Sequence, residues 1–403
     1  MLGDVGDYNI STFFWYFPAQ NNPSTAPLAI YLAGGPGESS IYTATASESG
    51  PCYVNVDGNS TTINPWSLNN HVNVLYIDQP VQAGFSYDSL VNGTFDLETG
   101  AVAPVQASEN IPASNATFGF GTFASQNPLT TTNTTVTSVK ALWHFAENWL
   151  TQFPEYQTEN KKISVWGNSY GGYWAPAATA YFDKNFKDAP KESPLQHFKM
   201  DTMGITNGCI DLLYMLPFYP ELAYNNTYQV EFIPEAVYQE ATQNFTKPGG
   251  CRDLIEQCRE LGEQGDPDWI GANQTVNEAC ILATDYCTFY VMGAFNALNN
   301  VCPGRDLLLY VLTCHASGVL LTWPYNMSMA KTLVPITSRS SDSSIKSGFK
   351  KRWESHSTSP MTPTSSRRNS RWIRLIRPKA PAIRSAKTSR TSNTSCKTGS
   401  RPP

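Results

Sequence analysis

Residues 163–171 read I-S-V-W-G-N-S-Y-G, an apolar run that leads into a serine with a glycine two positions away on each side. The last part of this stretch fits G-x-S-x-G, the pattern of a sharp strand-to-helix turn that lifts a serine hydroxyl above a sheet. A β-carbon at either glycine would crowd the neighbouring strand or helix. With a strand predicted over 163–166 and a helix over 172–187, the pattern predicts a nucleophile at Ser169. The alternative is a glycine-rich turn with an idle serine.

The surrounding chain alternates predicted strands with predicted helices. Apolar residues at helical spacing predict a helix over 136–150, and short apolar runs bounded by turn residues predict strands. These strands are expected at residues 28–33, 72–77, 163–166 and 200–206. Such alternation implies the α/β class, with a mostly parallel central sheet covered by helices on both faces.

Residues 210–302 have a different character, because they are rich in Tyr, Asn, Glu and Cys and show little strand pattern. Cys251 and Cys258 are seven residues apart, and so are Cys280 and Cys287. This spacing predicts a disulfide-rich helical insertion, which could form a lid, but it leaves the pairing open. We therefore divide the chain into a core over 1–209, this insertion, and a basic low-complexity tail over 303–403.

The charge of the chain changes sign near residue 300. The first 300 residues carry a net charge of −20, and residues 301–403 carry +15. From residue 331 on, Ser, Thr, Arg, Lys and Pro dominate without periodicity, and such a composition cannot bury enough apolar surface to fold alone. We expect this tail to be disordered, or to be the product of a frame shift or an unspliced intron near residues 299–303.

Two other interpretations of the tail concern partners. A disordered basic tail could bind nucleic acid or anionic lipid, but it lacks a folded motif and interleaved aromatic residues. Residues 307–323 could be a membrane anchor, but Thr, His, Ser and Cys within them make a poor span. We therefore expect neither a nucleic-acid partner nor a membrane anchor.

Nine cysteines in the chain and eight Asn-x-Ser/Thr sequons within the first 300 residues suggest a disulfide-bonded glycoprotein of the secretory route. The sequons begin at Asn9, Asn59, Asn92, Asn115, Asn133, Asn225, Asn244 and Asn273. The first thirty residues show no basic segment followed by an apolar one, so we expect the N-terminus to be incomplete and the mature protein to be secreted or vacuolar. The alternative is a cytosolic protein with chance sequons.

Three stretches together resemble the serine carboxypeptidases, an α/β-hydrolase family of secreted and vacuolar exopeptidases. They are Y-L-A-G-G-P-G-E-S-S at 31–40, Y-I-D-Q-P-V-Q-A-G-F-S-Y at 76–87 and G-N-S-Y-G-G-Y-W-A-P at 167–176. The run F-F-W-Y-F at 13–17 is also similar to the family's first strand, and the likeness covers roughly residues 8–300. The resemblance implies an α/β-hydrolase fold and release of C-terminal residues from peptides through an acyl-enzyme.

The resemblance assigns roles to five residues. Ser169 matches the nucleophile, and the backbone N–H groups of Gly35 and Tyr170 match the oxyanion hole. Glu48 and Asn168 match positions that bind the terminal carboxylate of the substrate. No cluster of His, Cys and Asp has convincing metal-ligand spacing, so we expect no metal or cofactor.

Two of the matched positions depart from the family pattern. The family often has Asn where Ala33 stands, and Glu where Asn168 stands. A carboxyl group donates a hydrogen bond to a carboxylate only when it is protonated, whereas an amide donates at any pH. Asn168 should therefore extend peptide binding to higher pH, unless it merely suits the strained turn.

The partners that a serine nucleophile needs are missing from the expected places. The family has its Asp in a Y-S-G-D-type segment and its His in a G-H-x-x-P-type segment, and neither occurs here. The histidines are His71, His144, His197, His315 and His356, and the late acidic residues are Asp306, Asp342 and Glu354. None has the right position and neighbours, so we expect the resemblance to stop near residue 300 and the last strands to be missing.

Two alternatives to an active carboxypeptidase follow. One is a catalytically inactive, truncated homologue. The other is an esterase or lipase on the same fold, which is disfavoured because the G-G-P-G loop and Glu48 suit carboxylate recognition. The sequence leaves open the oligomeric state, the preferred side chain at the cleavage site and the choice between vacuole and cell exterior.

Overall fold

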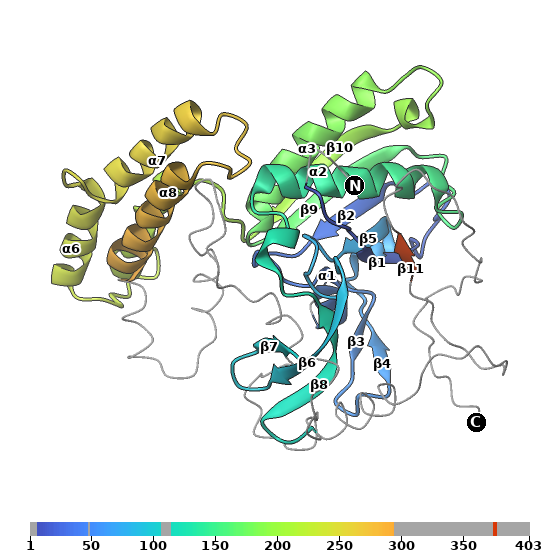
Figure 1. Cartoon of the computed structure of the whole chain (residues 1–403), viewed down its shortest axis with the longest axis horizontal. Coiled ribbons are helices and arrows are strands. Elements are labelled where there is room, and N and C mark those ends of the chain that lie inside the picture. Colours follow the sequence, from blue (N-terminus) through green and yellow to red (C-terminus); the bar gives the residue numbers. More distant parts are fainter. Residues whose placement is uncertain (1–5, 47–48, 106–113, 294–373, 377–403) are drawn as a thin grey trace.

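A mixed six-stranded sheet forms the centre of the computed structural model, which describes residues 6–46, 49–105, 114–293 and 374–376 (Figure 1). The strand order is β10-β9-β2-β5-β1-β11. The strands β2, β5, β9 and β10 are mutually parallel, whereas β1 and β11 are antiparallel to their neighbours. The sheet comprises β1 (Thr12–Phe17), β2 (Leu28–Leu32), β5 (Asn73–Ile77), β9 (Lys162–Asn168), β10 (Lys199–Thr206) and β11 (Arg374–Ile376). The predicted α/β class with a mostly parallel central sheet is confirmed.

Helices cover both faces of this sheet. The helices α2 (Thr135–Gln152) and α3 (Gly171–Asp188) lie on one face, and α1 (Ser40–Ala46) lies on the other (Figure 1). Every residue of β2 and β5 is buried, and their alternate side chains enter two separate cores. Ile30 packs with the helices α2 and α3, whereas Tyr31 packs on the side of α1. Fully apolar strands suit this arrangement because neither face meets water.

The structure also contains strands that the sequence did not predict. The strands β3 (Cys52–Val54) and β4 (Thr61–Ile63) form a hairpin, and an antiparallel sheet contains β6 (Leu90–Asp96), β7 (Val102–Pro104) and β8 (Phe118–Ala124). Glycines interrupt β6 and β8, so these segments look like turns in the sequence. The small sheet buries only Phe95 and Phe123 between its strands, which explains its weak apolar pattern.

The insertion is helical, as predicted. It contains α4 (Leu212–Met215), α5 (Phe218–Tyr224), α6 (Glu235–Thr246), α7 (Cys251–Gly265), α8 (Gln274–Cys287) and a π-helical turn, η4 (Thr288–Met292). Disulfides join Cys251 to Cys287 and Cys258 to Cys280. Seven residues are about two helical turns, so both cysteines of each helix lie on one face. The first cysteine of α7 bonds the last of α8, which settles the pairing that the spacing left open.

Removing one of these disulfides should destabilise the insertion. The Cys251–Cys287 bond spans 36 residues of sequence, and closing such a loop stabilises the folded state by about 4 kcal/mol in the chain-entropy model. A Cys251→Ala/Cys287→Ala double variant should lose about that much in urea unfolding followed by circular dichroism. Cys52→Ala is the control, because Cys52 is a free cysteine. Equal loss in both variants would contradict the expected role of the bond.

Much of the basic tail lies outside the described residues, including segment 307–323 and the composition change near residue 300. Residues 374–376 are an exception, because they form β11 and pair with β1 from Thr12 to Phe14. In the part of the chain that the structure describes, no helix is long and apolar enough to cross a membrane. The division into core, insertion and tail stays a prediction.

Candidate functional site

Ser169 lies on the tight turn between β9 and α3. Its φ is 55°, in the left-handed region that few side-chain-bearing residues adopt. The Ser169 N–H donates to the Thr206 carbonyl at 3.1 Å, and the Ser169 carbonyl accepts from the N–H groups of Gly172 and Cys209, both at 2.9 Å. These three backbone hydrogen bonds hold the strained conformation, which persists only where its surroundings fix it.

The glycines around the turn are required by close backbone contacts. A β-carbon on Gly167 would lie 2.2 Å from the carbonyl oxygen of Gly171, at the start of α3. A β-carbon on Gly34 would lie 2.5 Å from the Ser169 β-carbon and 2.9 Å from the Tyr170 nitrogen. The first contact is the crowding that the sequence predicted. The second shows that the loop after β2 rests directly against the serine, a role for Gly34 that the pattern did not reveal.

The Ser169 hydroxyl is buried, and no described residue pairs with it. The residue is 4% exposed, and its Oγ makes no hydrogen bond with any described residue. Among the described histidines, His71 and His197 are exposed, and the His144 Nδ1 lies 3.1 Å from Glu147 Oε1 on α2. None of the three contacts the serine.

The remaining residues considered as partners lie outside the described part of the chain. They are His315, His356, Asp306, Asp342 and Glu354. The expectation that the Asp and the His of the triad are missing therefore stays a prediction.

Three of the predicted site residues meet at one end of the sheet. Gly35, with a φ of 103°, lies in the loop that touches Ser169, and Tyr170 follows the serine directly. The Tyr170 side chain points away into the core, where its hydroxyl lies 3.1 Å from Thr135 Oγ1 of α2. Burial raises the pKa of this phenol to about 12, so it stays protonated and serves as a packing group.

Of the two predicted carboxylate-binding residues, the structure describes Asn168 but not Glu48. Asn168 is the last residue of β9 and is half-buried beside the serine. Glu48 lies outside the described residues. Its predicted role stays a prediction.

Asp78 is a site residue that sequence reasoning did not single out. It follows β5, is fully buried, and accepts hydrogen bonds from Ser39 Oγ at 2.7 Å, Ile41 N–H at 3.2 Å and Phe85 N–H at 2.9 Å. Its carboxylate thus anchors the start of α1, where helix N–H groups favour negative charge. Anchoring α1 fixes the far end of the loop that carries Gly35. The sequence signals were its place directly after a buried strand and within the Y-I-D-Q-P run of the stretch 76–87.

Asp78 should make the stability depend on pH. Burial raises the pKa of its carboxyl to about 6, against about 4 in an unfolded chain. Between these values the folded state binds a proton that the unfolded state does not, so the unfolding free energy should fall as pH rises from 4 to 6, by about 3 kcal/mol from this group. Asp78→Asn should remove this fall, because an amide does not titrate in this range.

Urea unfolding at several pH values between 4 and 7 measures this difference. Asp201→Asn is the control, because hydrogen bonding to Lys162 lowers the pKa of the Asp201 carboxyl instead. The control should keep the fall between pH 4 and 6. Parallel pH curves for the native chain and Asp78→Asn would contradict the account.

No metal site is present among the described residues, where no group of three or more His, Cys, Asp and Glu side chains could hold an ion. The groups that the structure brings together at this end of the sheet are a buried hydroxyl, a helix N-terminus and backbone N–H groups. Such an arrangement can hold a reacting carbonyl against the hydroxyl while donating to its oxygen.

Comparison with protein families gives a match to the serine carboxypeptidase family over residues 4–359. This match extends beyond residue 300, where we expected the resemblance to stop. The pairwise alignments with curated relatives are shorter. Carboxypeptidase S1 homolog A of Arthroderma otae is 44% identical over 298 residues, which cover 73% of this chain and 46% of the relative. The Carboxypeptidase Y homolog of Arthroderma benhamiae is 40% identical over 295 residues, which cover 72% and 46%.

The chain thus spans about half the length of these curated relatives. Among solved structures, Kex1(delta)p, a prohormone-processing carboxypeptidase from Saccharomyces cerevisiae, aligns with a TM-score of 0.43 and 24% sequence identity. That alignment covers 71% of this chain and 50% of the other.

Proposed function

This chain belongs to the serine carboxypeptidase family, and on that premise we propose that it is a serine-type carboxypeptidase whose nucleophile is Ser169. The observation that carries the proposal is the buried Ser169 hydroxyl, which has no hydrogen-bond partner among the described residues and is held at a φ of 55° against Gly34. A buried polar group without a partner is costly, so its persistence in a strained turn favours a role in chemistry over a role in packing.

The proposed reaction passes through an acyl-enzyme. The Ser169 Oγ attacks the carbonyl carbon of the last peptide bond and loses its proton to a base. The N–H groups of Gly35 and Tyr170 donate to the oxyanion, and one such donor is worth about 3 kcal/mol in the transition state. The C–N bond then breaks, the terminal amino acid leaves with a proton, and water releases the peptide from the serine. The described residues supply no base within hydrogen-bond distance of the Ser169 Oγ.

Substrates are proposed to be peptides or proteins with a free C-terminus. An exopeptidase must recognise the free carboxylate of its substrate, so it needs polar groups near its serine. Glu48 and Asn168 would bind that carboxylate. The two disulfides of the insertion and the eight sequons support passage through the secretory route, with the protein secreted or vacuolar. No metal or cofactor is required by this chemistry.

A pair of matched peptides separates this proposal from an esterase. The full chain should release the last residue of a peptide with a free carboxylate and leave the C-terminal amide of the same peptide intact. Equal cleavage of both would favour a different hydrolase. No cleavage of either, together with normal folding, would favour the inactive homologue, which stays the second candidate because the Asp and His of the triad are expected to be missing.

The residue before the serine gives a prediction about pH. Asn168 can donate to a carboxylate at any pH, whereas a glutamic acid can do so only when protonated. The native chain should therefore keep its kcat/KM to higher pH than Asn168→Glu, with the difference mostly in KM. The measurement is kcat/KM from pH 4 to 8, and identical profiles would count against a role for Asn168 in carboxylate binding.

A further inference from the structure

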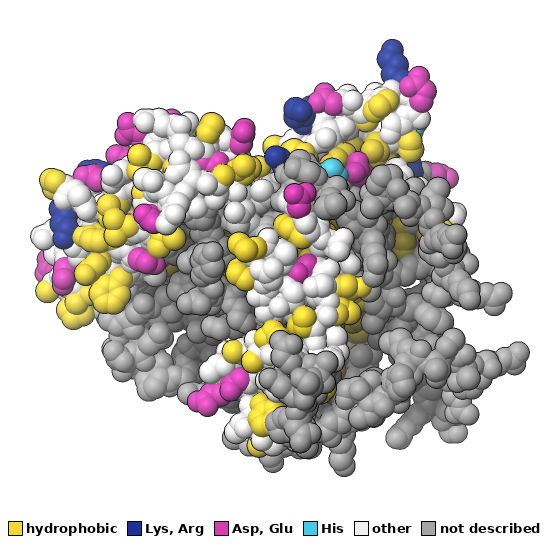
Figure 2. Space-filling view, in the orientation of Figure 1, with side chains coloured by type: hydrophobic (Ala, Val, Ile, Leu, Met, Phe, Trp, Pro, Cys, Tyr) yellow, Lys and Arg dark blue, Asp and Glu magenta, His cyan; other side chains and the backbone are white. Residues whose placement is uncertain are grey.

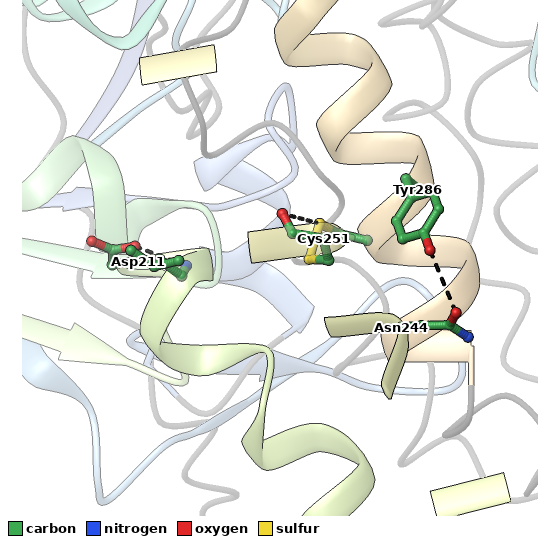
Figure 3. Close-up of a disulfide and its surroundings, with 6 residues drawn as sticks. Asp211, Asn244, Cys251 and Tyr286 are labelled. Atoms are coloured by element: carbon green, nitrogen blue, oxygen red, sulfur yellow. Dashed lines mark hydrogen bonds between the residues drawn. A yellow bond between two sulfur atoms is a disulfide. The ribbon is translucent and has the colours of Figure 1, made fainter. Parts of the chain in front are cut away.

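Asn244 begins a sequon, Asn244-Phe245-Thr246, in the last turn of α6. Its side chain is held in one orientation, because Oδ1 accepts from Lys247 Nζ at 2.7 Å and from the Tyr286 hydroxyl at 3.4 Å. Figure 3 shows the bond from Tyr286. Both donors face the oxygen. The amide nitrogen, which is the atom that N-glycosylation modifies, makes no hydrogen bond within the described part of the chain.

Asn244 also lines a hollow in the surface of the insertion. The hollow has a volume of about 230 Å³ and is lined by Val237, Glu240, Ala241, Asn244, Phe289, Tyr290 and Gly293. Two aromatic rings form one wall, where Phe289 is 74% exposed and Tyr290 46% exposed, with ring centroids 4.9 Å apart. Figure 2 shows hydrophobic side chains gathered over this part of the molecule. Exposed aromatic rings around a hollow indicate a surface that binds a ligand or another apolar group.

We propose that Asn244 carries an N-linked glycan whose first N-acetylglucosamine lies in this hollow against Phe289 and Tyr290. A pyranose ring offers an apolar C–H face to the aromatic rings and polar groups to water and Glu240. The hollow is large enough for one such ring, and the sequon at its edge supplies the covalent attachment. The glycan would cover apolar surface that is otherwise exposed to water.

The attachment is the transfer of an oligosaccharide from a lipid diphosphate to the asparagine amide. The Asn244 amide nitrogen attacks C1 of the first sugar of a polyprenyl-diphosphate-linked oligosaccharide. The bond between C1 and the phosphate oxygen breaks, the amide loses a proton, and the lipid diphosphate leaves. The step needs passage through the secretory pathway and does not depend on carboxypeptidase activity.

Two other sequons of the insertion provide contrasts. Asn225 is exposed and is not among the residues that line this hollow, so a glycan there would extend into water. The Asn273 side chain caps α8, accepting from Thr275 N–H at 3.0 Å, and its amide nitrogen donates to the Gly265 carbonyl at 3.1 Å. Only at Asn244 are a fixed amide and an aromatic hollow combined.

The test uses the full chain secreted from a fungal host. Amidase treatment in ¹⁸O-water converts each glycan-bearing asparagine to labelled aspartate, which peptide mass spectrometry locates. We expect label at position 244. Under native conditions, its glycan should be released about tenfold more slowly than that of Asn225, because ring packing protects the linkage.

Variants connect the slow release to the hollow. Phe289→Ala should bring the release rate at Asn244 up to that at Asn225. Tyr214→Ala, which removes an exposed ring of α4 outside the hollow, should leave the slow release unchanged. An unmodified Asn244 overturns the proposal, whether or not Asn225 carries a glycan. Equal release rates at the two sites in the native chain also overturn it.

Discussion

A Gly167→Ala variant should lose about 3 kcal/mol or more of its unfolding free energy, because one added methyl group has no room at this position. Its β-carbon would lie 2.2 Å from the Gly171 carbonyl oxygen and 2.6 Å from the Gly171 carbonyl carbon. Both atoms belong to backbone, which cannot rotate away as a side chain can. Relief requires β9 and α3 to separate, and these elements hold the largest core cluster together. Urea unfolding followed by tryptophan fluorescence measures the loss.

Gly119→Ala is the matched control for this prediction. Gly119 also lies in a strand, β8, but a β-carbon there would meet no atom within 4 Å. The control should change the unfolding free energy by less than about 1 kcal/mol. If both variants were equally stable, the tight packing between β9 and α3 would not be what fixes the turn at Ser169.

A Gly34→Ala variant should slow phosphonylation of Ser169 by an organophosphorus fluoride by about 100-fold or more, the effect of losing one oxyanion donor. The added carbon would lie 2.5 Å from the Ser169 β-carbon and 2.7 Å from the Asn168 carbonyl oxygen. The loop must therefore retreat from the serine, taking the Gly35 N–H with it. The measurement is the rate of adduct formation, followed by the mass of the intact chain.

Loss of fold must be separated from loss of reactivity in this experiment. Circular dichroism and the unfolding midpoint report whether Gly34→Ala is folded at the assay temperature, and Gly119→Ala should react at the native rate. A folded Gly34→Ala variant with the native rate of adduct formation would show that the loop after β2 does not contribute to the oxyanion hole.

The sequence predicted the middle of the central sheet well because β2 and β5 are buried on both faces and α2 is buried along one regular stripe. The run at 28–33 is wholly apolar and the run at 72–77 is apolar apart from Asn73, and the structure places β2 and β5 in the middle of the sheet. The apolar spacing at 136–150 identified α2 to within two residues at each end. The seven-residue cysteine spacing predicted paired helices, although only the antiparallel arrangement of α7 and α8 decided which cysteines bond.

Features that depend on contacts distant in sequence were not predicted. Asp78 is bonded to Ser39 and Ile41, which lie more than 35 residues earlier in the chain. Gly34 touches Ser169 across 135 residues, so the pattern around the serine could not reveal that contact. The strands β6 and β8 were missed because their glycines resemble turns. The hollow at Asn244 needs α6 and η4 to come together, which a sequon alone does not show.

The most direct test of the central proposal is the site of covalent modification by an organophosphorus fluoride. The full chain and Ser169→Ala are treated with the same reagent, and the modified peptide is identified by mass spectrometry. The account predicts one adduct, on Ser169, and none on the variant. A folded native chain that remains unmodified at Ser169 would contradict it, and would identify the protein as a member of the family that has lost its nucleophilic serine chemistry.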